Sequence, residues 1–151
     1  MNLKVQRFPV GHKLYSVAKV TNTDPKKGLV GTFECVFGQW VDDKGNIICF
    51  NLERKDTLIA EGTRKFHFYN SPENKLRVPI MEDEPGLGTF NRCLEVHPAN
   101  FPYELKGCSA PCIGVNAPLG MGITSRAAWD KLMALINNQE GTITYETLKL
   151  N

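Results

Sequence analysis

The chain has 151 residues, a net charge of +2 and 42% apolar residues. This composition fits one domain over residues 1–151 and excludes a strongly basic nucleic-acid-binding protein, in which Lys and Arg cluster on one face. No run of about 18 apolar residues is present, so we expect no membrane-spanning helix. The first residues lack the apolar stretch of a signal peptide, and we expect the protein to be made in the cytoplasm.

Short β-type runs follow one another through most of the chain, separated by turn signals. Each run is rich in Val, Ile, Phe, Tyr or Cys, and the separators contain Gly, Pro, Asn or Asp. The segment Asp43-Lys44-Gly45-Asn46 lies between two such runs and predicts a hairpin. The predicted strands are, in chain order, Leu14–Val20, Gly31–Phe37, Ile47–Leu52, Arg64–Tyr69 and Arg92–His97.

One helix is predicted near the C-terminus, from Ser125 to Asn137, with Thr124 or Ser125 as its cap. After it, the segment Thr142–Leu148 alternates like a final strand. The sequence therefore predicts a mainly β (α+β) fold: an antiparallel sheet or small barrel with one C-terminal helix packed on it. The apolar residues at helical spacing that we expect to face the sheet are Trp129, Leu132, Leu135 and Ile136.

Five cysteines, an odd number, indicate reduced thiols rather than a disulfide framework. Cys35 and Cys49 lie in β-type runs, where a buried Cys behaves as a small apolar residue. Cys108 is different, because it follows Gly107 and lies shortly after His97. An imidazole can accept the thiol proton, and a Gly lets the backbone turn tightly enough to expose the sulfur. These residues offer the most reactive chemistry in the chain.

A zinc site is the alternative use of Cys93, His97, Cys108 and Cys112, which resemble a four-ligand set. Cys93 and His97 lie four residues apart on one predicted strand, which separates them by about 13 Å. Ligands of one zinc lie within roughly 4 Å of each other. We therefore expect no metal at these residues, and the sequence indicates no cofactor.

An ordered series of short motifs resembles a family of phage and bacterial proteins known as domain of unknown function 5675. The matching segments are Leu52-Glu53, Ile59-Ala60-Glu61-Gly62-Thr63, Val96-His97-Pro98-Ala99-Asn100, Gly107-Cys108 and Ser125-Arg126. Ala99 stands where the family carries Gly. The family's Gly-Cys-Ile fits Cys108, which follows a Gly, or Cys112, which precedes an Ile; we favour Cys108. The resemblance implies a phage-encoded protein that could be carried in the virion.

The order of His, Gly-Cys, helix and a closing Gly-Thr segment is also similar to that of L,D-transpeptidases of peptidoglycan metabolism. Pro98 and Leu105 depart from that pattern, since they stand where those enzymes carry Gly and Ser. The resemblance implies that Cys108 attacks the carbonyl of a peptidoglycan stem peptide while His97 takes the thiol proton. Backbone N–H groups at Gly107 and Cys108 would stabilise the oxyanion.

Two further residues are candidates for orienting the imidazole. Asn100 is the first, and Glu53 is a weaker one, whose simpler interpretation is an exposed carboxylate at a strand end. A neighbouring imidazolium would lower the pKa of Cys108 and make it the fastest thiol to alkylate. The alternative function is a non-catalytic β domain that binds a phage or host protein, with Cys108 merely packed in a loop.

Overall fold

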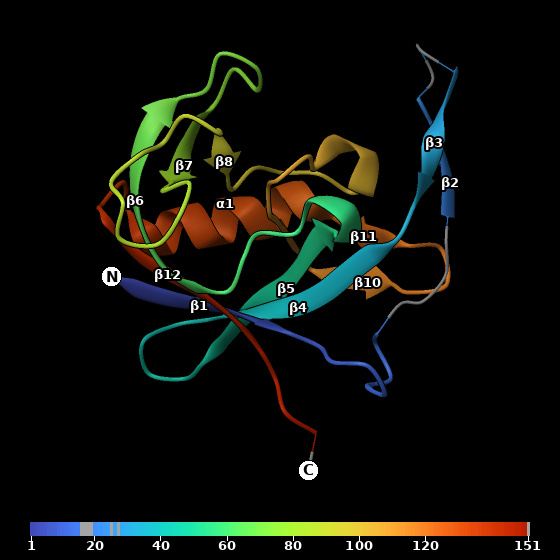
Figure 1. The fold of residues 1–151 in the computed structure, drawn as a ribbon, viewed down its shortest axis with the longest axis horizontal. Helices are drawn as coiled ribbons and strands as arrows, with labels where there is room; N and C mark the ends of the chain where they lie inside the picture. The colour runs from blue at the N-terminus through green and yellow to red at the C-terminus, as the bar shows by residue number, and fades with distance from the viewer. Residues whose placement is uncertain (16–19, 25, 27, 151) are drawn as a thin grey trace.

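The computed structural model describes residues 1–15, 20–24, 26 and 28–150, and a curled eight-stranded sheet forms most of it (Figure 1). The strand order in this sheet is β8-β7-β6-β12-β1-β4-β5-β9. The pair β1–β12 is parallel, and the other six pairs are antiparallel. The strands are β1 (Asn2–Arg7), β4 (Cys35–Val41), β5 (Ile47–Arg54), β6 (Gly62–Asn70), β7 (Arg77–Met81), β8 (Leu94–Glu95), β9 (Ala110–Cys112) and β12 (Gly141–Thr147).

Two small hairpins, one α-helix and two short 3-10 helices complete the described part of the chain. One hairpin pairs β2 with β3, and the other pairs β10 with β11. In Figure 1 the α-helix lies between the β6–β7–β8 part of the sheet and the β4–β5 part. These elements are β2 (Val20–Asp24), β3 (Gly28–Phe33), η1 (Lys55–Thr57), η2 (Pro102–Glu104), β10 (Gly114–Asn116), β11 (Met121–Ile123) and α1 (Ser125–Ile136).

The two edge strands of the large sheet meet where β8 and β9 approach each other. Val96, just after β8, forms a parallel bridge with Ser109, just before β9. The His97 N–H donates to Ser109 O at 3.1 Å, and the Ser109 N–H donates to Glu95 O at 3.0 Å. The curled sheet therefore closes on itself here, and we call residues 94–97 with 108–110 the seam.

The main core lies between α1 and the sheet. Along β1, Leu3 and Val5 are buried while Asn2 and Lys4 are exposed, as expected for a strand with one face on a core. The apolar stripe of α1 is buried against the sheet, and Trp129 Nε1 donates to Val96 O at 3.0 Å. The buried apolar residues of the helix are Ala128, Trp129, Leu132 and Ile136.

Leu135 does not belong to that stripe, and its prediction as a sheet-facing residue is wrong. Its side chain is 42% exposed, because residues at positions 128, 132 and 136 define one face of the helix and position 135 lies beside it. The predicted helix itself is confirmed. It ends at Ile136, and Asn137 follows in a left-handed conformation whose N–H donates to Met133 O.

The start of α1 is capped from outside the helix. Thr124 has φ of 54° and makes no side-chain capping bond. Asn100 Oδ1 instead accepts the N–H of Ser125 at 3.0 Å. The Ser125 hydroxyl accepts from the Ala99 N–H at 2.8 Å and donates to Pro111 O at 2.7 Å. Thr124 thus occupies the predicted N-cap position without the capping hydrogen bond, and α1 is tied to the chain that follows His97.

The mainly β fold is confirmed, and so are several of its predicted elements. Ile47–Leu52 and Arg64–Tyr69 lie within β5 and β6, and Thr142–Leu148 matches β12 within one residue at each end. The hairpin between β4 and β5 is also present. It is stabilised by the Asp42 carboxylate, which accepts the N–H groups of Lys44 and Asn46.

Three predicted strands differ from the structure. Gly31–Phe37 spans the end of β3 and the start of β4, which Glu34 separates. Only Leu94–Glu95 of the segment Arg92–His97 is a strand, because Cys93 has φ of 53°, outside the extended region. In Leu14–Val20, Leu14 and Tyr15 are not in a strand, Val20 begins β2, and residues 16–19 lie outside the described part.

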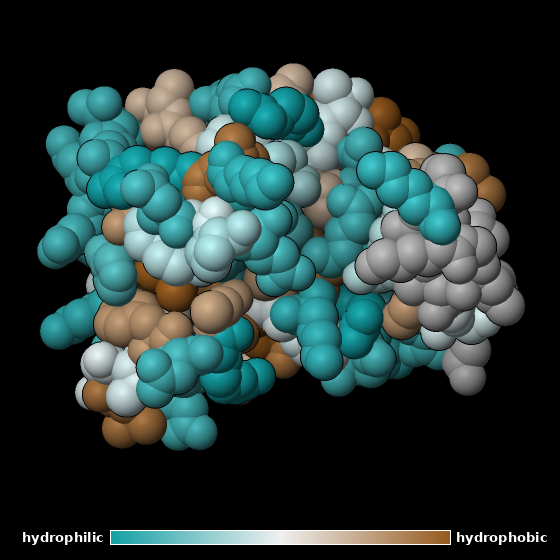
Figure 2. Space-filling model, turned by 90° about the horizontal axis from the view of Figure 1, so that it is seen from above, coloured by the Kyte–Doolittle hydropathy of each residue, from teal (hydrophilic) through white to brown (hydrophobic). Residues whose placement is uncertain are grey.

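Within the described residues, no helix has the length and apolar content needed to cross a membrane. The face of the molecule seen from above is covered mostly by hydrophilic side chains, with small apolar areas between them (Figure 2).

Candidate functional site

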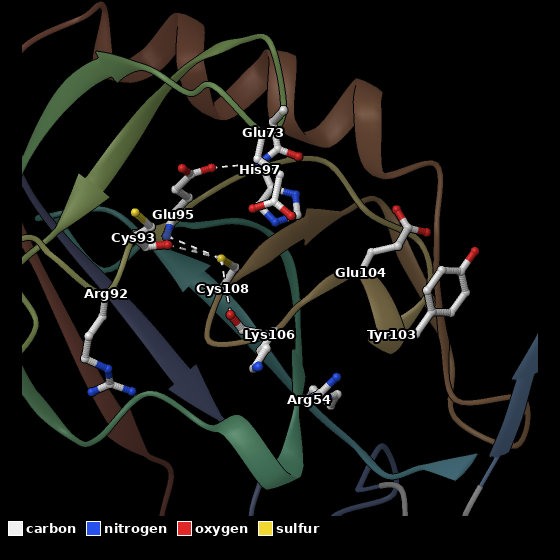
Figure 3. Close-up of a pocket in the computed structure, with 11 residues that line it drawn as sticks. Arg54, Glu73, Arg92, Cys93, Glu95, His97, Tyr103, Glu104, Lys106 and Cys108 are labelled. Atoms are coloured by element: carbon white, nitrogen blue, oxygen red, sulfur yellow. Dashed lines mark hydrogen bonds between the residues drawn. The ribbon is translucent and has the colours of Figure 1, made fainter. Parts of the chain in front are cut away.

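A pocket of about 610 Å³ lies beside the seam. It brings together residues from the end of β5, the loop after β6, the seam and the segment around η2 (Figure 3). Its lining consists mostly of polar and charged residues, with two thiols among them. The lining residues are Arg54, Glu73, Asn74, Arg92, Cys93, Glu95, His97, Tyr103, Glu104, Lys106 and Cys108.

The seam explains why His97 and Cys108 share this pocket. Val96 and Ser109 are paired, so their side chains point to one face, and the neighbours of each point to the opposite face. Val96 and Ser109 do not line the pocket, whereas the buried Glu95 and His97 and the half-buried Cys108 do. The structure thus places in one pocket the two residues that the sequence predicted as base and nucleophile, together with a carboxylate. Within the described residues no hydrogen bond joins His97 to Cys108, whose sulfur contacts Cys93 O and Glu95 N instead.

The His97 imidazole is held in one orientation by the backbone that follows it. Its Nδ1 lies 3.2 Å from Pro98 O. A carbonyl oxygen can only accept a hydrogen bond, so Nδ1 carries the proton and Nε2 is left with its lone pair. Burial lowers the pKa of His97, while the carboxylates of Glu95 and Glu73 oppose that shift. The imidazole is therefore a neutral base whose acceptor nitrogen is Nε2.

The Cys108 thiol is half-buried at the wall of the pocket. Its Sγ lies 3.6 Å from Cys93 O and 3.5 Å from the backbone N of Glu95. Burial raises the pKa of this thiol to about 12, and the charge of Glu95 acts in the same direction. This shift is opposite to the lowered pKa that we expected from an imidazolium neighbour. The resting site therefore contains a protonated thiol, and the faster alkylation of Cys108 stays a prediction.

The Glu95 carboxylate is 3% exposed and is held by three neutral donors. The Tyr69 hydroxyl donates a hydrogen bond to Oε2. The Ser71 hydroxyl and the Asn74 amide donate to Oε1 at 3.0 and 2.7 Å. Burial and this carboxylate together raise the pKa of Tyr69, which keeps its hydroxyl proton available as a donor. Glu95 was not among the predicted site residues, although its position two residues before His97 on a predicted strand places both on one face.

Asn100 and Gly107 have structural roles instead of the predicted catalytic ones. The Asn100 amide oxygen accepts from Ser125 N, and within the described residues no hydrogen bond joins Asn100 to His97. The Gly107 N–H donates to Thr57 Oγ1 at 3.1 Å, so it is not available as an oxyanion donor in this structure. Gly107 has φ of 75°, and this left-handed conformation turns the chain into the seam before Cys108.

The remaining thiols are placed differently from Cys108. Cys35, Cys49 and Cys112 are buried, which confirms the structural interpretation of the first two. Cys93 is exposed and lines the pocket. Cys112 is separated from the pocket, so Cys108 is the cysteine of its loop that a ligand can reach. Among the residues that the structure describes, no group of three or more His, Cys, Asp or Glu side chains is arranged to hold a metal ion.

Glu53 is not the exposed strand-end carboxylate that its position suggested. It is 1% exposed, and Arg7 binds it through two hydrogen bonds of 2.8 Å, from Nε and from the second guanidinium nitrogen. Arg7 also donates to Ile59 O at 2.6 Å and lies over the Tyr145 ring. Glu53 does not line the pocket, so its role is in the interior of the sheet.

Three cationic side chains line the pocket, and none of them was among the predicted site residues. Arg92 and Lys106 are exposed, and Arg54 donates to Asp56 at 2.6 Å. Figure 3 shows Lys106 and Arg54 on one side of Cys108 and His97 with Glu73 on the other. The pocket therefore offers positive charge on one side of the thiol and negative charge on the other.

The chain was compared with models of known protein families, with curated proteins and with solved structures, and none of them matches it.

Proposed function

We propose that the pocket is the active site of a cysteine-dependent acyl-transfer enzyme that acts on a peptide stem of peptidoglycan, as a peptidase or transpeptidase. The observation that carries the proposal is the seam, which directs Cys108 and His97 from two separate chain segments into one pocket. The bond between His97 Nδ1 and Pro98 O adds support, because it leaves Nε2 free to accept a proton. Pro98 O takes the orienting role that Asn100 does not fill.

The neutral state of both groups defines the order of steps. Cys108 Sγ attacks the carbonyl carbon of the substrate, and its proton passes to His97 Nε2 as the C–S bond forms. The tetrahedral intermediate then expels the amine, which takes the proton from His97, and leaves a thioester on Cys108. Water or an acceptor amine attacks this thioester to release the product. Lys106 lines the same pocket and provides positive charge to it, whereas the charge of Arg54 is paired with Asp56.

The test uses purified peptidoglycan and the soluble disaccharide peptides released from it. We expect the intact protein to cleave or exchange a peptide bond in the stem, detected as a change in mass. Cys108→Ala should abolish this reaction, and His97→Gln should reduce it by about 100-fold or more, the usual size of a general-base contribution. Cys93→Ser is the matched control, because it removes the second thiol of the same pocket and should leave most of the activity.

Two results would refute the enzyme proposal. One is full activity in Cys108→Ala, and the other is a folded wild-type protein that leaves every stem peptide unchanged. A covalent adduct on Cys108 trapped with a peptide thioester or chloromethyl ketone, and absent in His97→Gln, would support it independently of the natural substrate.

The second candidate is a non-catalytic domain that binds a phage or host protein. It is favoured by the commitment of the Gly107 N–H to Thr57 and of the Asn100 amide to α1, since both groups then stabilise the loop around the thiol. The raised pKa of Cys108 also fits a packed thiol. Under this alternative, Cys108→Ala would change neither binding nor any enzymatic readout.

A further inference from the structure

We propose that Glu95 is a positioning residue of this site: its buried carboxylate favours a protonated His97 and disfavours negative charge on Cys108. The inference rests on the proposed function for its catalytic meaning. The interaction itself is a property of the free protein and can be measured without a substrate.

The geometry of the seam supports this role. Glu95 and His97 alternate with the buried Val96 and therefore lie on the same side of the chain. The Glu95 backbone N is 3.5 Å from Cys108 Sγ, and its backbone O accepts the N–H of Ser109. The same backbone that closes the sheet therefore fixes Glu95 beside the nucleophile and two residues before the base.

The carboxylate is held without a cationic partner. Its donors are Tyr69, Ser71 and Asn74, all neutral, and no salt bridge to Glu95 occurs within the described residues. Neutral donors stabilise a carboxylate without cancelling its charge, so its field extends to the other groups in the pocket.

The charges around His97 come from every side of the pocket, and Glu95 is the buried one among them. Glu73 faces the imidazole from the loop after β6, and Glu104 with Tyr103 comes from η2. Lys106 and Arg54 lie on the side of the sulfur away from His97. Arg92 and Cys93, from the segment that precedes β8, also line the pocket. On the α1 side, the ring nitrogen of Trp129 is bonded to Val96 O. Exposed charges are screened by solvent, so the buried carboxylate has the largest effect.

The consequence concerns the timing of charge in the reaction. Before substrate binds, Glu95 opposes formation of a thiolate and keeps Cys108 protonated. During the attack, the thiol proton passes to His97 as the C–S bond forms, so positive charge develops on the imidazole and negative charge develops on the carbonyl oxygen. The Glu95 carboxylate stabilises the imidazolium, so it favours this proton transfer once substrate is bound.

The test is an NMR titration of the three histidines in wild type and variants, with the His12 and His67 signals as internal references. Glu95→Gln keeps the side-chain shape and removes the charge. We expect the His97 titration midpoint to fall by about one pH unit, the lower end of the effect of a nearby opposite charge. Glu95→Asp retains the charge, so its His97 titration midpoint should lie close to the wild-type value. Glu73→Gln is the exposed control and should produce a clearly smaller shift.

An unchanged or higher His97 midpoint in folded Glu95→Gln would overturn the inference. If that variant fails to fold, the double variant Tyr69→Phe with Glu95→Gln removes the same charge without leaving the Tyr69 hydroxyl unpaired, and the same criterion applies to it. Loss of turnover in Cys108→Ala tests the proposed function separately. The titration of His97 can thus refute the inference on Glu95, and turnover retained in Cys108→Ala can refute the enzyme proposal.

Discussion

Two of the three buried carboxylates in the described residues, Glu53 and Glu95, are held by contrasting partners. Glu53 is bonded to the guanidinium of Arg7, which cancels its charge inside the sheet. Glu95 is bonded to a phenol, a hydroxyl and an amide, and it lines the pocket. A cation-paired carboxylate contributes to the architecture, whereas one held by neutral donors projects its charge to neighbouring groups. Glu53 and Glu95 are both buried, so the hydrogen-bond partner of each carboxylate, more than its burial, distinguishes the structural residue from the candidate functional one.

The largest effect should come from breaking the Arg7–Glu53 pair. Arg7→Met leaves Glu53 buried without its cation and should lower the free energy of unfolding by about 3–5 kcal/mol. Urea denaturation measures this loss. The double variant Arg7→Met with Glu53→Met is the control, and it should recover much of the stability because no charge remains buried. A loss below about 1 kcal/mol in the single variant would contradict a structural role for the pair.

Glu95→Gln should lower the free energy of unfolding by less than Arg7→Met does. The amide keeps an acceptor oxygen for part of the donor set, but one donor is left facing the new NH₂ group. We expect the free energy of unfolding to fall by about 1–3 kcal/mol, measured by the same denaturation. If the two variants were equally destabilised, Glu95 would be as structural as Glu53 and the contrast between them would disappear.

Removing one of the hydrogen-bond donors to Glu95 should lower the free energy of unfolding by less than Glu95→Gln does. Ser71 is 3% exposed, and its hydroxyl donates to Glu95 while accepting the N–H of Asn74. Ser71→Ala should lower the unfolding free energy by about 1 kcal/mol. Thr63→Ala removes an exposed hydroxyl that is bonded to Thr144 across β6 and β12, and it should stay within about 0.5 kcal/mol of wild type. Equal losses in the two variants would argue against a buried donor set at Glu95.

The smallest expected effect is on the pH dependence of the free energy of unfolding. The unfolded chain takes up a proton at each imidazole near pH 6.5. Folded His97 does so at lower pH, because burial lowers its pKa. The unfolded state therefore binds more protons as the pH falls below about 6.5, and stability declines in that window. His97→Gln should reduce this decline in denaturation curves recorded between pH 7.5 and 5.5. An unchanged slope would mean that His97 titrates alike in both states.

Local patterns predicted the parts of the fold that depend on nearby residues. Helical spacing gave α1, and the two-residue alternation gave β12. The same alternation is present at Leu3 and Val5 and would have revealed β1. The seam could not be predicted in this way, because it is a short parallel pairing between segments that only the closure of the sheet brings together.

In the candidate site, too, features that depend on residue type and order were predicted, and features that depend on distant partners were not. Cys108 and His97 were predicted from residue type and order, and the structure places both in the pocket. The roles assigned to Asn100 and Gly107 depended on the partners of single polar groups, and those partners are Ser125 and Thr57. Thr57 lies 50 residues from Gly107 along the chain, so no local pattern indicates their bond.

The position of β12 has a consequence for how the chain folds. This strand, formed by Gly141–Thr147, lies between β1 and β6, so the sheet contains a contact between residues 2–7 and residues 142–147. Such long-range pairing raises the contact order and slows folding, because a large loop must close before the contacts form. During synthesis, β1 and β6 have no strand to join them until β12 has left the ribosome. The nascent chain must therefore keep two strand edges unpaired, and a chain that stops before Gly141 lacks the strand that unites the two halves of the sheet.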